Sequence, residues 1–232
     1  IGFGIDPEIG EGNQGGPPFF PPEVDVRQAG GRSGNRHVYP LIQDHPGGVR
    51  IVFEGGFVTA QHGVVVVAHD DGPAASSRWR SSGRHGENLF AHIEAAMDEA
   101  EVARSDLSMI GVSLGPGGFT SLRVGLATAK GLALALDLPI VGVSSLRVLA
   151  RSIDGTEDTV RVPLMNAYRG DLFAAAYGVH PDCVTVLVEP FYDAPSDVLS
   201  AVRTVVGDAP VGFRGEGVEP HRALIEEAFG RP

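Results

Sequence analysis

The chain has 232 residues, a formal net charge of −11 and 43% hydrophobic residues, values typical of a globular protein with one or two domains. The acidic charge argues against a protein that grips a nucleic-acid phosphate backbone unaided. The single cysteine, Cys183, excludes an internal disulfide and a thiolate metal site, so we expect a reducing, cytoplasmic compartment. No apolar run reaches the roughly 20 residues of a membrane-spanning helix, and we expect no membrane contact.

Residues 1–48 differ in composition from the rest of the chain, because they contain 11 glycines and 7 prolines. Such a segment buries too little apolar surface to offset an ordering entropy of about 1–2 kcal/mol per residue. We predict that it is a disordered extension or is foreign to the natural protein. The folded domain is then expected at residues 49–232.

From residue 49 onward the hydrophobic pattern becomes regular. A first set of predicted elements contains strands at 49–53, 64–69 and 76–80, a helix at 87–100, a strand at 109–114, a helix at 120–136, a strand at 139–143 and a short helix to about 151. A second set contains strands at 160–166, 172–177 and 184–188 and helices at 196–203 and 220–229. Two such sets predict an α/β fold with two similar lobes, about 49–152 and 153–232, whose mixed sheets are flanked by helices. The second lobe is expected to be reduced.

The glycine-rich segment 115–123 lies between a predicted strand and the long predicted helix. It matches neither the Walker nor the Rossmann phosphate loop. One interpretation is a tight turn in which glycine supplies a positive φ and Thr120 caps the helix. The other is an anion or partner site, because free amides at a helix start attract negative charge. The residues of that candidate site are Gly115, Pro116, Gly117, Phe119, Thr120 and Arg123.

The helix predicted at 120–136 carries a buried stripe and several small residues. The stripe is formed by Leu122, Leu126, Ala129, Ala133 and Leu136. Each interior glycine costs about 1 kcal/mol relative to alanine. Gly125 and Gly131 therefore indicate close approach by another backbone, from the same chain or from a partner.

The run from Gly115 to Ala133, followed by Pro139-Ile-Val-Gly-Val-Ser-Ser-Leu146, resembles the signature of the TsaB (YeaZ) family. The resemblance covers about residues 49–232 and includes His85-Gly-Glu-Asn-Leu89, Arg169-Gly170-Asp171 and Gly215-Glu216-Gly217. It implies the two-lobed, actin-like fold shared by sugar kinases and heat-shock chaperones. It also implies a non-catalytic partner of TsaD, which transfers a threonylcarbamoyl group to adenosine next to the anticodon of tRNA, together with an ATPase called TsaE.

The resemblance places the partner-binding face on the helices at 87–100 and 120–136, with His85, Leu89, Thr128 and Gly131 as contact residues. The acidic charge predicts only indirect contact with tRNA, and the resemblance implies no tightly bound cofactor. It leaves open whether ATP or ADP binds at a joint interface, and whether the chain alone forms a homodimer. The sequence departs from the family pattern at Glu54, Gly118, Ser121, Asn166 and Tyr168.

Other classes of site find less support. A metal site could use His85 and His92 with Glu87 and Glu94, but an exposed helix with scattered polar groups explains them better, so we expect no metal. Cys183 is interpreted as a buried apolar residue rather than a nucleophile, and we expect no catalytic residue. The main alternative is an autonomous nucleotide-binding phosphotransferase of the same fold. It would use Glu54 as a metal anchor and residues 215–217 as a nucleotide loop.

Overall fold

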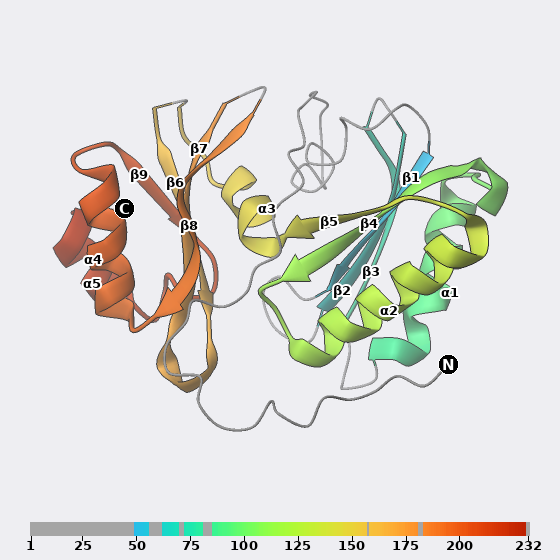
Figure 1. The fold of residues 1–232 in the computed structure, drawn as a ribbon, viewed down its shortest axis with the longest axis horizontal. Helices are drawn as coiled ribbons and strands as arrows, with labels where there is room; N and C mark the ends of the chain where they lie inside the picture. Colours follow the sequence, from blue (N-terminus) through green and yellow to red (C-terminus); the bar gives the residue numbers. More distant parts are fainter. Residues whose placement is uncertain are drawn as a thin grey trace, which may run out of the picture.

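The computed structural model describes residues 49–55, 62–69, 72–80, 85–156, 158–180 and 183–230. The extension predicted at residues 1–48 lies outside the described residues. Two β-sheets stand side by side, and each carries helices on the face that points away from the other sheet (Figure 1). This arrangement confirms the predicted fold class of two α/β lobes.

The first lobe contains a five-stranded sheet in the order β3-β2-β1-β4-β5. The strand β1 pairs antiparallel with β2 and parallel with β4, and β4 pairs parallel with β5. The elements are β1 (Val49–Gly55), β2 (His62–His69), β3 (Gly72–Arg80), α1 (His85–Glu99), β4 (Leu107–Gly115), α2 (Phe119–Leu136) and β5 (Ile140–Ser144), with a 3₁₀ turn at Arg104–Asp106.

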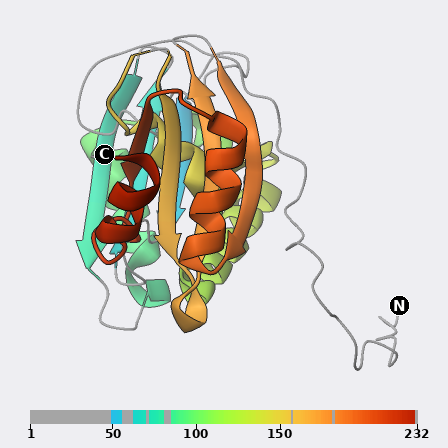
Figure 2. The ribbon, with the colours of Figure 1, turned by 90° about the vertical axis from the view of Figure 1, so that its left-hand side faces the viewer.

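The second lobe repeats this plan with one strand fewer. Its sheet has the order β8-β7-β6-β9, which corresponds to the first four positions of the first sheet. Figure 2 shows α4 and α5 over the outer face of this sheet. The elements are β6 (Val160–Asn166), a 3₁₀ turn (Tyr168–Gly170), β7 (Leu172–Val179), β8 (Val184–Asp193), α4 (Pro195–Val206), β9 (Val211–Arg214) and α5 (Arg222–Phe229). The prediction of a similar but reduced second lobe is therefore confirmed.

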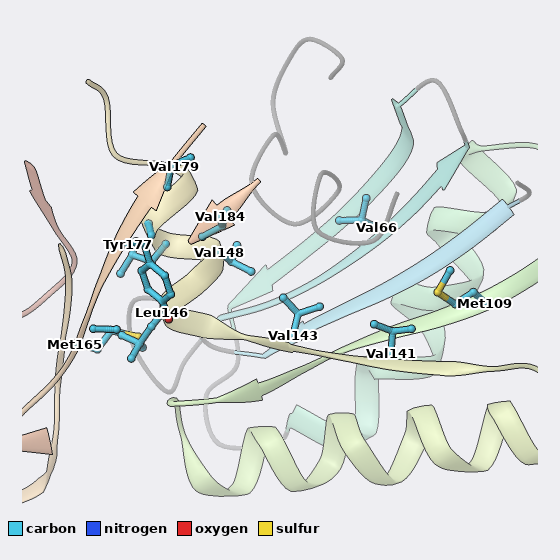
Figure 3. Packing of buried hydrophobic residues seen from close by; sticks show 13 residues of the cluster. Val66, Met109, Val141, Val143, Leu146, Val148, Met165, Tyr177, Val179 and Val184 are labelled. Atoms are coloured by element: carbon cyan, nitrogen blue, oxygen red, sulfur yellow. The ribbon is translucent and has the colours of Figure 1, made fainter. Parts of the chain in front are cut away.

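The short helix α3 (Ser145–Arg151) lies between the two sheets (Figure 3). Its Leu146 is fully buried and packs in one cluster with Val143 of the first sheet and Tyr177 and Met165 of the second. This shared apolar core makes the two lobes one packed unit, because each sheet covers one side of α3.

Three local predictions differ from the structure. The helix α2 begins at Phe119 with Gly118 as its N-cap, so the expected cap at Thr120 is wrong. Cys183 is exposed in the turn between β7 and β8, so its predicted burial is also wrong. The strand β9 was not predicted, because Gly212 and Arg214 interrupt its short apolar pattern.

Candidate functional site

The glycine-rich turn that leads into α2 has a structural explanation. Gly115 has a φ of +99°, where a side chain is strained, and a Cβ there would lie 3.0 Å from Leu122 Cδ1. The helix starts without a side-chain cap, and the Leu122 N–H donates a hydrogen bond of 2.9 Å to the Gly118 carbonyl. Pro116 is buried and Gly117 is half-buried. The segment 115–118 therefore forms a tight turn between β4 and α2, as the first interpretation of the glycine-rich segment predicts.

An aromatic and a cationic side chain stack on the first turn of α2. The Arg123 guanidinium lies 4.1 Å from the centroid of the Phe119 ring, and Phe119 is 60% exposed. A contact of this kind stabilises by about 0.5–1 kcal/mol at an exposed site. It holds Arg123 on the outer surface of the helix, next to the exposed Thr120.

The outer face of α2 is an exposed stripe of small, apolar and basic residues at spacings of three and four. Its members are Thr120, Arg123, Ala127, Lys130, Gly131 and Leu134. Leu134 is 87% exposed, an unusual state for a leucine. A Cβ added at Gly131 or at Gly125 would meet no atom within 4 Å. Neither glycine is therefore required by contacts among the described residues, and both leave room for a backbone from outside the lobe.

The buried side of α2 follows the predicted stripe. Ala129 and Ala133 lie in the core of the first lobe with Ile110 and Val112 of β4, while Thr128 is half-buried. By length and composition, α2 is the one helix in the described part of the chain that could cross a membrane. Ala129 and Ala133 pack against β4, whereas the other apolar residues of α2 are half-buried or exposed.

The helix α1 lies beside α2 on the same face of the first sheet (Figure 1). Leu89 is only 5% exposed and packs in the core with Ile93, so it supports α1 from beneath and adds no outer surface. Phe90, next in the chain, is 54% exposed. The helix begins at His85, whose side chain lies outside what the structure describes.

The outer faces of the two helices carry opposite charge. The exposed charged residues of α1 include Glu94, Asp98 and Glu99, whereas α2 has Arg123 and Lys130 and no acidic residue. We define the α1/α2 face as these five residues together with Phe90, Ala127, Gly131 and Leu134. The face was predicted on these two helices, but Phe90 and Leu134 were not among the predicted contact residues. Leu134 could have been found, because it lies beside the buried stripe rather than on it.

The residues considered for a metal site are engaged in other contacts. His92 Nδ1 lies 2.8 Å from Ser77 Oγ, and the ring stacks on Trp79 with 4.2 Å between centroids. The carboxylate of Glu94 accepts a hydrogen bond of 3.0 Å from Arg104. Within the described ranges, no group of three His, Cys, Asp or Glu residues could hold a metal ion. The side chains of Glu54 and Glu87 lie outside the description.

Residues 80–225 match the family described as "TsaD: tRNA N6-adenosine threonylcarbamoyltransferase". The chain is 32% identical over 149 residues to the "tRNA threonylcarbamoyladenosine biosynthesis protein TsaB" of Bacillus subtilis, covering 63% of this chain and 62% of that protein. The protein of the same description from Escherichia coli is 27% identical over 120 residues, or 51% of this chain and 52% of that protein.

The fold has a counterpart among solved structures. "YeaZ from Pseudomonas aeruginosa" aligns with a TM-score of 0.56 and 23% sequence identity over 65% of this chain and 71% of that one. At this level of identity the likeness shows the fold alone. The chain spans about three fifths of the length of its Bacillus subtilis relative and about half of its Escherichia coli relative.

Proposed function

The chain belongs to the family of TsaD, the tRNA N6-adenosine threonylcarbamoyltransferase, with TsaB (YeaZ) among its relatives, and we propose that it is a non-catalytic partner subunit. It binds a TsaD-like protein in the complex that forms threonylcarbamoyladenosine next to the anticodon of tRNA. The TsaD-like protein carries out the transfer, and a TsaE-like ATPase acts on the assembled pair. ATP or ADP, where it binds, binds at the joint interface rather than tightly to this chain.

The observation that carries the proposal is the α1/α2 face. Phe90 on α1 and Leu134 on α2 are 54% and 87% exposed. A Cβ added at Gly131 of α2 would meet no atom within 4 Å. On α2, Ala127, Gly131 and Leu134 follow one another at spacings of four and three and are all exposed, and an exposed small and apolar stripe of this kind suits protein association. The missing side chain at Gly131 allows a facing helix to approach at an axial separation of about 8–10 Å or less.

The net negative charge of the chain supports a complex in which the partner contacts tRNA. The chain has 29 acidic and 18 basic residues, and this net negative charge disfavours binding to a phosphate backbone. The partner is expected to make most contacts with tRNA. The opposite charges of α1 and α2 also allow two copies to pair through the α1/α2 face when the partner is absent. We place the complex in the cytoplasm, since one exposed cysteine suits a reducing compartment.

A reconstitution experiment tests this function. Purified chain, alone and with the TsaD-like and TsaE-like proteins of the same source, is incubated with tRNA, ATP, threonine and the enzyme that makes the threonylcarbamoyl adenylate. We expect modified adenosine only when the TsaD-like protein is present, and at least about tenfold more when this chain is added to it. Modification by the chain without the TsaD-like protein would disprove the non-catalytic assignment.

Binding is measured separately from activity. Calorimetric titration of the chain with the TsaD-like protein should give saturable, one-to-one association. An exposed apolar residue of the other lobe, Val205, provides the control position, because it is 55% exposed and belongs to α4, a helix that lies away from α1 and α2 (Figure 1). If Val205→Glu abolished association, the partner-binding surface would have to include the second lobe.

A further inference from the structure

The two lobes are joined by a short segment, residues 152–159, between the end of α3 at Arg151 and the start of β6 at Val160. We call it the interlobe linker. A two-lobed protein that closes on a ligand bends at a few linker residues, whose φ and ψ angles change. Gly155 is exposed and has a φ of +156°, so it is the residue of this linker best suited to act as a hinge. Whether the linker can bend depends on what holds its backbone.

The interlobe linker packs against β9, the edge strand of the second sheet. A Cβ added at Gly212 of β9 would lie 2.6 Å from Ile153 Cγ2 and 3.5 Å from the Asp154 carbonyl oxygen. Ile153 is buried, although it lies outside the helices and strands. Gly212 is therefore required so that the linker can lie against the sheet at this point.

Two arginines flank Gly212 on the same face of the sheet. Arg161 of β6 is opposite Gly212 in the parallel pairing, and Arg214 is two residues further along β9, so the two side chains share one face. Arg161 Nη2 donates a hydrogen bond of 3.2 Å to the Gly155 carbonyl. Arg214 Nη1 donates one of 2.7 Å to the Ser152 carbonyl. The linker is thus held at two carbonyl groups, from two neighbouring strands.

Contacts within the interlobe linker fix the segment that these arginines hold. The Thr156 N–H donates a hydrogen bond of 3.1 Å to Thr159 Oγ1, and the Thr159 N–H donates one of 3.1 Å to the Thr156 carbonyl. A Cβ added at Gly155 would lie 2.7 Å from Thr159 Cβ. At the other end, the Ser152 hydroxyl donates a hydrogen bond of 2.6 Å to the Leu149 carbonyl of α3. A rotation about Gly155 would therefore disturb contacts on both sides of it.

Burial makes the contact of Arg161 with the linker difficult to break. The residue is 9% exposed, and its Nε is buried and has no hydrogen-bond acceptor among the described residues. A buried guanidinium that loses an acceptor is left with an unsatisfied charge, which is costly. A movement of the linker that carried the Gly155 carbonyl away would have this effect on Arg161. The contact therefore opposes bending of the linker.

We propose that Arg161 and Arg214 form a clamp that holds the interlobe linker against the second sheet and fixes the orientation of the two lobes. The apolar core around α3 holds the lobes together, and the arginine clamp prevents the linker from acting as a hinge. The chain is thus a rigid two-lobed body rather than one that opens and closes. The inference does not rest on the proposed function, because neither arginine belongs to the α1/α2 face.

The test measures the distribution of distances between the lobes in the full chain. Cys183 is exposed in the turn between β7 and β8, and it carries a spin label on the second lobe. Ala135→Cys, on the exposed side of α2, carries a spin label on the first lobe. Pulsed electron paramagnetic resonance gives the distances between the two labels. Amide hydrogen exchange of residues 152–159 is measured in the same variants without labels.

Four changes are compared in this background. Arg214→Ala removes the exposed donor of the clamp, and Arg214→Lys keeps one group that can donate to the Ser152 carbonyl. Arg161→Met, combined with Arg214→Ala, removes both donors while keeping a long side chain at the buried position. Arg203→Ala is the control, because it removes an arginine of the same lobe that pairs with Asp208 instead of the linker.

We expect one narrow distance distribution for the unchanged chain and for Arg203→Ala, and a broad one for the double variant. Linker exchange should rise at least about tenfold in Arg214→Ala, as loss of a charge-assisted hydrogen bond predicts, and Arg214→Lys should recover part of the protection. The proposal is overturned if the unchanged chain already has a broad distribution, or if the folded double variant keeps a narrow one. If the double variant does not fold, exchange decides, and unchanged linker exchange in Arg214→Ala overturns the proposal.

A parallel measurement separates this inference from the proposed function. Affinity for the TsaD-like protein should be the same for the clamp variants as for the unchanged chain, because the α1/α2 face lies within the first lobe. Failure of all variants, and of the unchanged chain, to bind that protein would count against the proposed function and leave the result on the linker intact.

Discussion

The two lobes share one strand order but present different helical surfaces. In the first lobe, the α1/α2 face contains the exposed Leu134 and Gly131, where an added Cβ would meet no atom within 4 Å. In the second lobe, the outer helices are tied by local contacts, such as the ion pair of 3.0 Å between Arg203 and Asp208 and the Phe213–Phe229 ring contact at 5.0 Å. The first lobe has contacts of the same kind, the ion pair of 3.0 Å between Glu94 and Arg104 and the Arg123–Phe119 contact, so the difference between the lobes lies in Gly131 and Leu134. The α1/α2 face is therefore the first place to test the proposed partner binding, and the outer helices of the second lobe provide its control.

The largest expected effect compares the cores beneath the two helical layers. Leu89 and Leu199 are 5% and 2% exposed under α1 and α4 respectively. Leu89→Ala and Leu199→Ala should each lower the free energy of unfolding by about 2–5 kcal/mol, because each leaves a cavity. Denaturant unfolding measures this. A loss below about 1 kcal/mol at Leu89 would mean that this side chain is not core, and would restore it as a candidate contact residue.

The next effect separates the outer surfaces. Leu134→Glu should weaken binding to the TsaD-like protein about a hundredfold, because burying an unpaired carboxylate in an apolar interface is costly. It should leave the melting temperature almost unchanged, since Leu134 is 87% exposed. Val205→Glu on α4 should change neither quantity. Calorimetry and thermal melting of both variants test the comparison, and equal losses of affinity would break it.

A smaller effect with opposite signs is expected at Gly131. Gly131→Leu removes a helix-interior glycine where no atom lies within 4 Å of the new Cβ, so stability should rise by up to about 1 kcal/mol. Affinity for the partner should fall about tenfold, because the added side chain separates the facing helices. Ala201→Leu on the exposed side of α4 is the matched control, with affinity expected to be unchanged. A fall in stability at Gly131 would show that its flank packs inside the lobe.

The sequence predicted those elements in which local pattern and tertiary packing agree. The bounds of β6, Val160–Asn166, match the prediction because an apolar run, interrupted only by Arg161, ends at a turn. The stripe of α2 was also correct, since Ala129 and Ala133 are buried. In contrast, β3 extends back to Gly72, because pairing with β2 orders residues that have little strand propensity of their own.

The candidate site was less accessible to sequence reasoning. Helical periodicity indicates which side chains face the core, but not how exposed the others remain, so Leu134 was passed over. In the second lobe, the hydrogen bond of 3.1 Å from the Gly217 N–H to the Leu164 carbonyl joins residues that are distant in the chain. It depends on the parallel pairing of β6 with β9, and β9 has no clear pattern of its own. A contact formed through an unrecognised strand could not be predicted.

The smallest expected effect uses a contact that the two lobes have in common. Arg123 lies 4.1 Å from the Phe119 centroid on α2, and Arg203 lies 5.5 Å from the Phe229 centroid between α4 and α5. Both arginines are exposed, and each contact should contribute about 0.5–1 kcal/mol or less to stability. Arg203 also pairs with Asp208, whereas the described contact of Arg123 is the ring alone. Arg123→Ala should therefore weaken partner binding several-fold with little change in melting, because an exposed arginine on an aromatic ring is typical of interface anchors.

Arg203→Ala should show the reverse, a small loss of stability with unchanged affinity. The two variants remove the same charge and the same kind of ring contact, so any difference in binding comes from the lobe on which they lie. Equal effects of the two variants on affinity would mean that the second lobe also contacts the partner. If only Arg203→Ala lowered the affinity, the partner-binding surface would lie on α4 and α5. The exposure of Leu134 on α2 would then require a different explanation.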